Sequence, residues 1–316
     1  MLDITLQNFE ADLITASLDQ PVLLDIWAPW CGPCKALGPV LEKLERDYDG
    51  RFLLAKLNSD EQPEIAGQLS QMFGVRSIPF CVLFKGGQPV DGFVGALPEG
   101  EVRKFLDKHV PSEAEVAADE ETEAAQALLD DGDVDRALEK LQEAVAINPA
   151  DDAARYQYLR ALLLAGRVDE ARRAYDQITP KLTPDPRLTA AGLWLQAFEA
   201  SASGRTAAEL QAAIATNKRD FDSRYALAQR HFAEHRYTEA MDELLEILMR
   251  DKGWSDELAR KTYVAVLEIM SKPATASKPE AAAGGEGKLE VAGRAAVAPS
   301  DPVVDTYRRR LSMTLF

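Results

Sequence analysis

Apolar residues in the first third of the chain alternate between short continuous runs and helical spacing. The runs PVLLDIWA (21–28) and RFLLAKLN (51–58) are rich in aliphatic residues and predict two buried strands. Residues 34–48 place apolar side chains on one face of a helix, and residues 61–73 read as a second helix. Pro39 is expected to kink the first helix, because proline removes one backbone hydrogen bond.

A hairpin and one more helix complete this part of the chain. Residues 80–95 read as two strands joined at Gly86-Gly87, a dipeptide that favours tight hairpin turns. Residues 98–110 have the pattern of a closing helix. Helices between strands, followed by a hairpin and a helix, predict an α/β fold for residues 1–110.

From residue 111 to about residue 270 the pattern is helical and repeats itself. Three similar stretches are DDGDVDRALEKLQEA (130–144), LAGRVDEARRAYDQI (164–178) and EHRYTEAMDELLEIL (234–248). Gly132 and Gly166 are 34 residues apart, and Ala240 of the third stretch follows Ala171 of the second at an offset of 69. A degenerate copy, SGRTAAELQAAI, stands between them at 203–214.

A period of 34 residues is that of tetratricopeptide repeats, which are pairs of helices. The second-helix signature is present in the first copy at Ala137, Leu141, Ala144 and Pro149, and the small position of the first helices falls on Ala125, Leu159 and Ala228. We therefore expect three to four tetratricopeptide-like helix pairs, forming an all-α domain over residues 111–270. Stacked pairs leave a groove that binds proteins or peptides; alternatively, the helices only brace the first domain.

The last part of the chain changes character twice. Residues 271–302 are rich in Ala, Gly, Pro, Ser and Lys and predict a flexible linker. Residues 303–316 predict an amphipathic helix, whose apolar stripe is formed by Val304, Tyr307, Leu311 and Leu315. This tail helix is expected either to dock on the repeats as their final cap or to bind another protein.

The charge of the chain excludes whole classes of partner. The net charge is −16, and acidic residues outnumber basic ones by 16 to 10 in residues 1–110 and by 36 to 26 in the remainder. This balance argues against nucleic acids and anionic membranes, which attract basic surfaces. No run of about 18 apolar residues predicts a membrane span, and the first residues lack the pattern of a signal peptide. With three cysteines in all, a cytoplasmic protein is expected.

Several ordered motifs make residues 1–110 resemble thioredoxin. They are VLLDIWAPWCGPCK, AKLNSDE, GVRSIP ahead of FCVLFKGGQPV, and VGALPEGEVRKFLDKHV. The resemblance implies an α/β thioredoxin fold, followed here by the all-α tetratricopeptide-like repeat domain. It also implies a redox-active Cys31–Cys34 disulfide as the reactive group, with no separate cofactor and no metal.

Cys31 and Cys34 are the candidate catalytic cysteines. Cys31 follows a predicted strand and opens a helix, where free backbone N–H groups and the positive helix end favour its thiolate. It would attack a substrate disulfide, and Cys34, one turn deeper, would resolve the mixed disulfide. Pro33 fits the first helical turn, where its missing N–H costs little.

Asp25 is the unusual residue within an apolar strand. An inward-facing carboxyl group has a raised pKa and could take the proton of Cys34; alternatively, Asp25 is a plain carboxylate at a strand end. The resemblance to thioredoxin places Asp25 at the family's buried aspartate and Lys56 at its usual lysine partner. It implies a substrate-binding surface formed by Trp30, Gly32, Pro33, Ile78 and Pro79, with Ile78-Pro79 as the cis-proline loop.

Four further side chains could carry chemistry, but a structural role is expected for each. Cys81 lies on a buried strand and reads as a packed apolar residue, with regulatory oxidation as the alternative. A structural zinc ion needs four ligands, and His109, His231 and His235 are far from the cysteines in sequence. The last two histidines are spaced as a metal pair on a helix, a spacing more typical of ordinary helix surface or packing.

The combination of both domains is similar to the bacterial chaperedoxins, the CnoX/YbbN proteins. Matching stretches include FGVRSIP, FKGGQPVDGF, FLLAKLN and TYRRRLSMTLF. That resemblance implies a holdase chaperone, which binds unfolding or oxidised client proteins, protects their cysteines by mixed disulfide and passes them to a GroEL-type chaperonin. A thioredoxin reductase or another thiol donor would reduce the site. The alternative function is a thioredoxin-type disulfide reductase whose repeats select specific folded partners.

Overall fold

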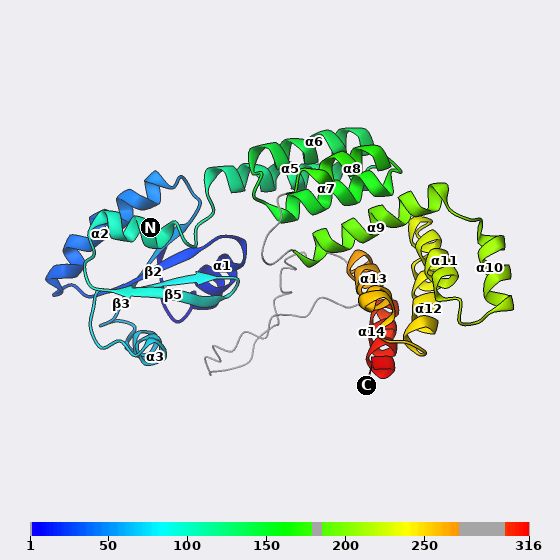
Figure 1. Cartoon of the computed structure of the whole chain (residues 1–316). Helices are drawn as coiled ribbons and strands as arrows, with labels where there is room; N and C mark the ends of the chain where they lie inside the picture. Colours follow the sequence, from blue (N-terminus) through cyan, green and yellow to red (C-terminus); the bar gives the residue numbers. More distant parts are fainter. Residues whose placement is uncertain (1, 179–184, 272–300, 316) are drawn as a thin grey trace. The chain divides into compact units, whose positions relative to one another are not determined.

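The computed structural model describes residues 2–178, 185–271 and 301–315. They form two compact units, of which the first ends at Val116 and the second comprises the described residues beyond it (Figure 1). Helix α5 (Glu113–Asp130) begins in the first unit and continues into the second. The domain boundary inferred from composition lies just before this helix, and it stays a prediction.

A five-stranded sheet, with the order β1-β3-β2-β4-β5, forms the centre of the first unit. The strands are β1 (Leu2–Asp3), β2 (Val22–Trp27), β3 (Leu53–Asn58), β4 (Phe80–Lys85) and β5 (Gln88–Val94). Strand β2 pairs parallel with β3 and antiparallel with β4, so the most apolar strands lie at the centre. The apolar runs that predicted strands, and the predicted hairpin, are confirmed; the two-residue strand β1 left no pattern to find.

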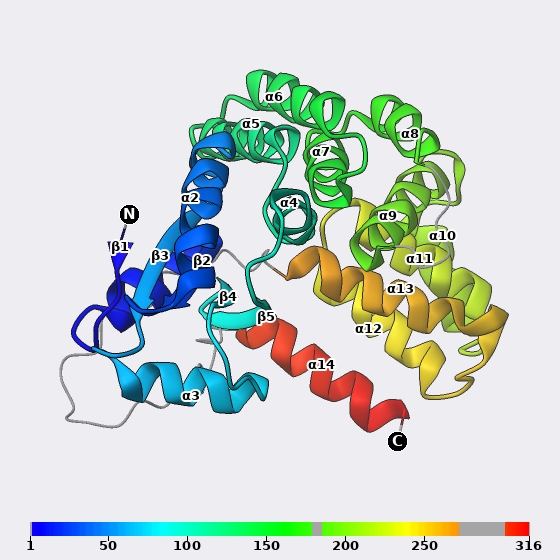
Figure 2. The same cartoon turned by 90° about the vertical axis from the view of Figure 1, so that its left-hand side faces the viewer.

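Helices cover both faces of this sheet. They are η1, a π-helical segment (Phe9–Thr15), α1 (Ala16–Asp19), α2 (Gly32–Asp47), α3 (Pro63–Phe73) and α4 (Glu99–Leu106). Alternation along β2 sends Leu23 toward α2 and α4, and sends Leu24 and Ile26 toward η1 and α3. Figures 1 and 2 show α2 and α3 on opposite sides of the strands. Helix α2 continues through Pro39, and the kink expected there stays a prediction.

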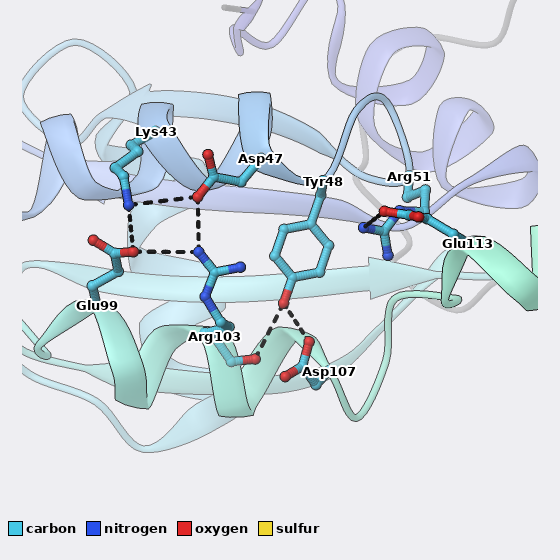
Figure 3. Close-up of polar contacts among 8 residues, drawn as sticks. All are labelled: Lys43, Asp47, Tyr48, Arg51, Glu99, Arg103, Asp107 and Glu113. Atoms are coloured by element: carbon cyan, nitrogen blue, oxygen red, sulfur yellow. Dashed lines mark hydrogen bonds and ion pairs between the residues drawn. The ribbon is translucent and has the colours of Figure 1, made fainter.

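Polar contacts fasten α2 to α4 and to the start of α5. Figure 3 shows the participants: Lys43, Asp47, Tyr48, Arg51, Glu99, Arg103, Asp107 and Glu113. Arg103 of α4 lies 2.8 Å from Asp47 of α2, and Arg51 donates to the Pro111 carbonyl at 3.0 Å while pairing with Glu113. Surface ion pairs contribute about 0–1 kcal/mol each, so their main effect is to fix how α2 lies. They involve the C-terminal half of α2, whereas the cysteines are at its N-terminus.

Every regular element that the structure describes beyond Val116 is an α-helix. After α5 come α6 (Val134–Ile147), α7 (Asp152–Leu164), α8 (Val168–Asp176), α9 (Pro186–Ser203), α10 (Ala207–Thr216), α11 (Phe221–Ala233), α12 (Tyr237–Leu248), α13 (Trp254–Met270) and α14 (Pro302–Leu315). Helices α5–α6, α7–α8 and α11–α12 pack as pairs, whereas α9 packs mainly on α11 and α13, and α10 packs on α11. The predicted all-α repeat fold is confirmed. No helix in the described ranges is long and apolar enough to cross a membrane.

The turns within these three pairs have the same backbone conformation. Gly132, Gly166 and His235 have positive φ angles of 82°, 71° and 60°. The N–H of the residue after each one bonds to the carbonyl five positions earlier, as in a Schellman-type helix end. Five residues beyond these turns stand Ala137, Ala171 and Ala240, each 0% exposed. The sequence repeat is therefore a structural repeat, in which His235 occupies the position of a glycine.

The core of the repeat unit is built around Trp194 of α9. Its side chain is 0% exposed and stacks on Phe232 of α11 at a ring distance of 5.8 Å. The indole N–H donates to the Phe232 carbonyl at 3.0 Å, which satisfies its buried polar atom. His235 packs against the same indole at 5.5 Å. Helix α9 is thus tied to α11 and to the turn that follows it by aromatic packing.

Candidate functional site

Two of the three cysteines, Cys31 and Cys34, lie at the N-terminus of α2. Cys31 caps this helix and forms a disulfide with Cys34, and both side chains are 4% exposed. The backbone N–H of Cys34 donates to the Cys31 sulfur at 3.2 Å. Once the disulfide is reduced, this N–H and the positive end of the helix would both stabilise a thiolate at Cys31. The position therefore favours a reactive Cys31.

Residues from the end of β2 and from the loop before β4 pack against the cluster that contains the disulfide. Trp27 and Ile78 contact the buried cluster that Ala28 and the two cysteines form. The Ile78-Pro79 peptide is cis, and Pro79 itself is buried. The Pro79 carbonyl accepts a hydrogen bond from Gly95 at 2.8 Å, which ties this loop to the end of β5. The tertiary fold thus brings the predicted Ile78-Pro79 loop beside the cysteines.

The remaining residues of the predicted substrate-binding surface are exposed. Trp30 is 70% exposed, and its indole N–H donates to Asp60 at 2.9 Å. Gly32 and Pro33 lie in the first turn of α2 and are also exposed. An aromatic ring held at one edge by Asp60 presents a broad apolar surface, suited to contact with another protein.

Asp25 lies on the same face of the sheet as α2. It stands on β2 between Leu23, which packs against α2, and Trp27, which packs against the cysteines. The side chain is 2% exposed. Burial raises the pKa of Asp25 to about 6, against smaller lowering effects of the Lys56 ammonium and of a thiol hydrogen bond. A base with a pKa near 6 is suited to accept a proton near neutral pH.

Strand register places two side chains opposite Asp25. Lys56 on β3 and Cys81 on β4 are its direct neighbours, so all three lie on one face. Lys56 forms its ion pair with Glu42 of α2 at 2.7 Å. The Cys81 thiol lies 3.7 Å from the Asp25 carboxylate as a hydrogen-bond donor.

Some of these roles left no signal in the sequence. The prediction of Cys81 as a packed residue is confirmed, since its side chain is 0% exposed, but its bond to Asp25 was not predicted. Glu42 looked like an ordinary polar position of a helix. Trp27 was assigned only to a strand, although its side chain reaches the disulfide; its buried indole N–H has no partner among the described residues.

The histidines do not form a metal site in the described ranges, where no group of three or more potential ligands occurs. His231 is 4% exposed, and burial lowers its pKa. His235 packs among the rings of Trp194, Phe198 and Tyr237. His109 pairs with Asp91 at 2.8 Å. All three side chains are therefore used in packing or pairing.

The tail helix α14 packs on α12 and α13 within the repeat unit (Figures 1 and 2). Val304 and Tyr307 are 2% and 8% exposed, and Leu311 packs against the same core. The hydroxyl of Tyr263 donates to the Tyr307 carbonyl at 2.9 Å. The tail is docked in this structure as a final helix, one of its two predicted arrangements.

Polar contacts secure the other side of the tail helix. Asp242 of α12 accepts a hydrogen bond from the Tyr307 hydroxyl at 3.1 Å and forms an ion pair with Arg310 at 2.6 Å. Lys252 donates to the carbonyl of Leu315, the last residue of α14. The predicted linker before this helix, residues 271–302, lies almost wholly outside the described residues.

A cavity of about 530 Å³ lies among α6, α7 and α8. Val145 and Ile178 contribute apolar surface, and Arg155, Glu170 and Arg173 contribute charge. Arg155 is engaged with the Pro149 carbonyl, at 2.6 and 2.8 Å. This mixed lining is compatible with side chains of a bound protein segment.

Comparison with protein-family models divides the chain in the same order. A model described as thioredoxin matches residues 1–108. Two models described as tetratricopeptide repeat match residues 128–192 and 200–278.

Individual relatives match the first part of the chain. Thioredoxin 2 from Chlorobaculum tepidum is 50% identical over 104 residues, which are 33% of this chain and 90% of that protein. Thioredoxin 1 from Nostoc is 42% identical over 107 residues, 34% of this chain and 94% of that protein. The chloroplastic M-type thioredoxin of Zea mays is 38% identical over 101 residues, 32% of this chain and 58% of that protein.

Geometry and comparison therefore agree on the first unit. The first unit has a disulfide at the N-terminus of α2 and the Ile78-Pro79 loop beside it. Asp25 is buried on the face of the sheet that α2 covers. The sequence of this unit is 50% identical to nearly a whole thioredoxin. Thioredoxins react through such a disulfide and need no separate cofactor. The chain belongs to the thioredoxin family, and its thioredoxin domain is followed by tetratricopeptide repeats.

Proposed function

We propose that this protein is a redox-active holdase chaperone. The observation that carries the proposal is the presence, in one chain, of a thioredoxin-type disulfide and a stack of tetratricopeptide helices, a fold class that binds proteins. The redox site would form mixed disulfides with client cysteines. The helices would hold exposed apolar segments of the same client.

The exchange step follows from the arrangement at α2. In the dithiol form, the Cys31 thiolate attacks one sulfur of a client disulfide; a Cys31–client bond forms and the second client sulfur leaves as a thiolate. Cys34 then gives its proton to Asp25 and attacks Cys31. The Cys31–Cys34 bond forms, the bond to the client breaks, and the client leaves with two reduced sulfurs. The two electrons gained by the client are those lost by the two cysteines.

The surroundings of the site support protein substrates rather than small ones. Trp30, Gly32 and Pro33 are exposed around sulfurs that are only 4% exposed themselves. An exposed surface of this kind would admit an extended peptide, whose backbone could form hydrogen bonds beside the Ile78-Pro79 loop. In the repeat unit, the cavity among α6, α7 and α8 supplies a second place for a client segment.

The partners that belong to this proposal are cellular proteins. Clients would be unfolding or oxidised proteins, to be passed on to a GroEL-type chaperonin. A thioredoxin reductase or another thiol donor would return Cys31 and Cys34 to the dithiol form. The cytoplasm, where such donors act, is the compartment we propose.

Aggregation of a heat-unfolded client that contains no cysteine tests the holding activity. The full chain should suppress light scattering in a dose-dependent manner, and the double variant Cys31→Ser/Cys34→Ser should do so equally well. Reduction of insulin disulfides is measured in parallel. A chain that reduces insulin briskly but leaves aggregation unchanged is not a holdase.

The alternative is a disulfide reductase whose repeats select a few folded partners, and it makes the same use of Cys31. A Cys34→Ser variant separates the two functions, because it traps the mixed disulfide at Cys31. Many unrelated unfolded clients in the trap support the chaperone, whereas one or two folded partners support the selective reductase. The variant Cys31→Ser/Cys34→Ser is the matched control and should trap nothing.

A further inference from the structure

The exchange step described above makes no use of the third cysteine. Cys81 lies on β4 directly opposite Asp25 on β2, and its side chain is 0% exposed. Its sulfur lies 3.7 Å from the nearer carboxylate oxygen of Asp25. In the described part of the chain, this thiol is the only group that donates a hydrogen bond to that carboxylate.

The other charged groups around Asp25 act at longer range. Lys56 faces it from β3, but the Lys56 ammonium forms its ion pair with Glu42 of α2. From α2 itself, the groups at this end are Cys31 and Cys34, which are joined in the disulfide. The contact with Cys81 is thus the direct one, and the lysine contributes through its field.

The Cys81 thiol is protonated at neutral pH. Burial, and secondly the neighbouring Asp25 carboxylate, raise the pKa of the Cys81 thiol well above its usual value. A thiol that stays protonated is a hydrogen-bond donor, although a weak one. A donor bonded to an ionised carboxylate stabilises the ionised form.

We propose that Cys81 is a positioning residue for Asp25: its thiol holds the carboxylate by a hydrogen bond and keeps it ionised, ready to accept the proton of Cys34. The inference rests on the proposed exchange activity and adds a residue to it. Cys81 touches neither substrate nor the reacting sulfurs, so it acts through Asp25. An aliphatic residue would fill the same space without this bond.

The test compares Cys81→Val with Cys81→Ser in the full chain. Valine has a similar volume but no donor, whereas serine keeps a donor at the same place. The measurement is the single-turnover rate of insulin disulfide reduction by the dithiol form, followed as a function of pH. The valine variant should need a higher pH for half-maximal rate and lose about twofold in rate at pH 6, as expected for a rise of about half a unit in the pKa of Asp25. The serine variant should match the parent chain or react faster at that pH.

Leu83→Ile is the matched control for a change in packing. Leu83 is the next residue of β4 on the same face and is 0% exposed, but it pairs with Leu23. The variant Leu83→Ile should leave the pH dependence of insulin reduction unchanged. A valine variant whose profile coincides with the parent, or whose rate falls equally at every pH, overturns the proposal.

Direct titration of Asp25 keeps the inference separate from the proposed function. Carbon-13 resonances of the Asp25 carboxyl group are followed in the oxidised chain, where no exchange takes place. The pH midpoint of this titration should rise in Cys81→Val and remain unchanged in Cys81→Ser. If the parent chain reduces no disulfide, the proposed function fails, yet this titration still decides whether Cys81 stabilises the carboxylate; equal midpoints in both variants refute that role.

Discussion

The two units of this protein position their important side chains in different ways. In the thioredoxin unit, Asp25, Lys56 and Cys81 come from three strands far apart in sequence, and register brings them to one face. In the repeat unit, equivalent residues recur along the chain, and packing joins neighbouring helices. The first arrangement concentrates chemistry at one point, whereas the second distributes stability over many similar contacts.

Exposure of polar groups follows the same division. The sheet buries a carboxylate, Asp25, at 2% exposure, although burial raises its pKa to about 6 and thereby costs stability at neutral pH. The repeat core instead buries Trp194 with its indole N–H satisfied. Substitution of Asp25 should therefore raise the free energy of unfolding at neutral pH, whereas substitution of Trp194 should lower it.

Loss of the attacking sulfur should have the largest effect on activity. Cys31→Ser should reduce the rate of insulin reduction to that of the uncatalysed reaction, because hydroxyl cannot form the mixed disulfide. Circular dichroism at 222 nm should show unchanged unfolding of the repeat helices. Residual reduction well above background would show that another group attacks, and would break the assignment of chemistry to the first unit.

Removal of the central indole of the repeats should have the largest effect on stability. Trp194→Ala should lower the free energy of unfolding of the repeat unit by about 3–5 kcal/mol, while insulin reduction stays unchanged. Trp30→Ala is the matched control, because this tryptophan is 70% exposed; its effect on stability should remain within about 0.5 kcal/mol. Similar destabilisation by both variants would contradict the assigned packing.

Asp25→Asn should stabilise the thioredoxin unit and slow its reaction. The pKa of Asp25 lies near 6 in the folded chain, above the ordinary aspartate value of 3.8, so the folded state binds more protons between these values. Stability of the parent chain should therefore fall as pH rises from about 4 to about 6 and level off above it. At pH 7 the asparagine variant should be more stable by up to about 3 kcal/mol.

Chemical denaturation of this variant and the parent at pH 4 and pH 7 measures the difference. The exposed Asp19→Asn is the control, and it should change stability by no more than about 0.5 kcal/mol at either pH. If Asp25→Asn gave the same stability difference at both pH values, the carboxyl group would not titrate as the buried site requires.

The turn at His235 should give the smallest effect. His235 has a φ of 60° at a repeat position where the other copies have glycine, and alanine there would be strained by about 1 kcal/mol. His235→Gly should therefore be more stable than His235→Ala by about this amount. The comparison of glycine with alanine removes the lost ring contacts from both sides. Equal stabilities would mean that this turn relaxes and is not a repeat of the turn at Gly132.

Local patterns in the sequence were sufficient for the elements and for the cysteines. Apolar runs predicted β2 and β3, because a buried strand is apolar along its length. A 34-residue period predicted the helix pairs, because each repeat is one pair of helices. Resemblance to thioredoxin, carried by several ordered motifs, implied the Cys31–Cys34 disulfide. Asp25 was conspicuous as a charged residue within an apolar strand, and the resemblance added Lys56 as its partner. The tail residues Val304 and Tyr307 followed a helical stripe, but the stripe left both docking and partner binding open.

The sequence by itself determined the order of elements, the reactive sulfurs and the repeat, since each depends on residues close together in the chain. Only the tertiary structure decided that the Cys81 thiol donates a hydrogen bond to Asp25 and that Glu42 forms an ion pair with Lys56. It also decided that the tail helix packs on α12 and α13. These contacts join residues 14 to 68 positions apart. Strand register and helix stacking fix which distant groups meet, and neither leaves a signature at the single positions involved.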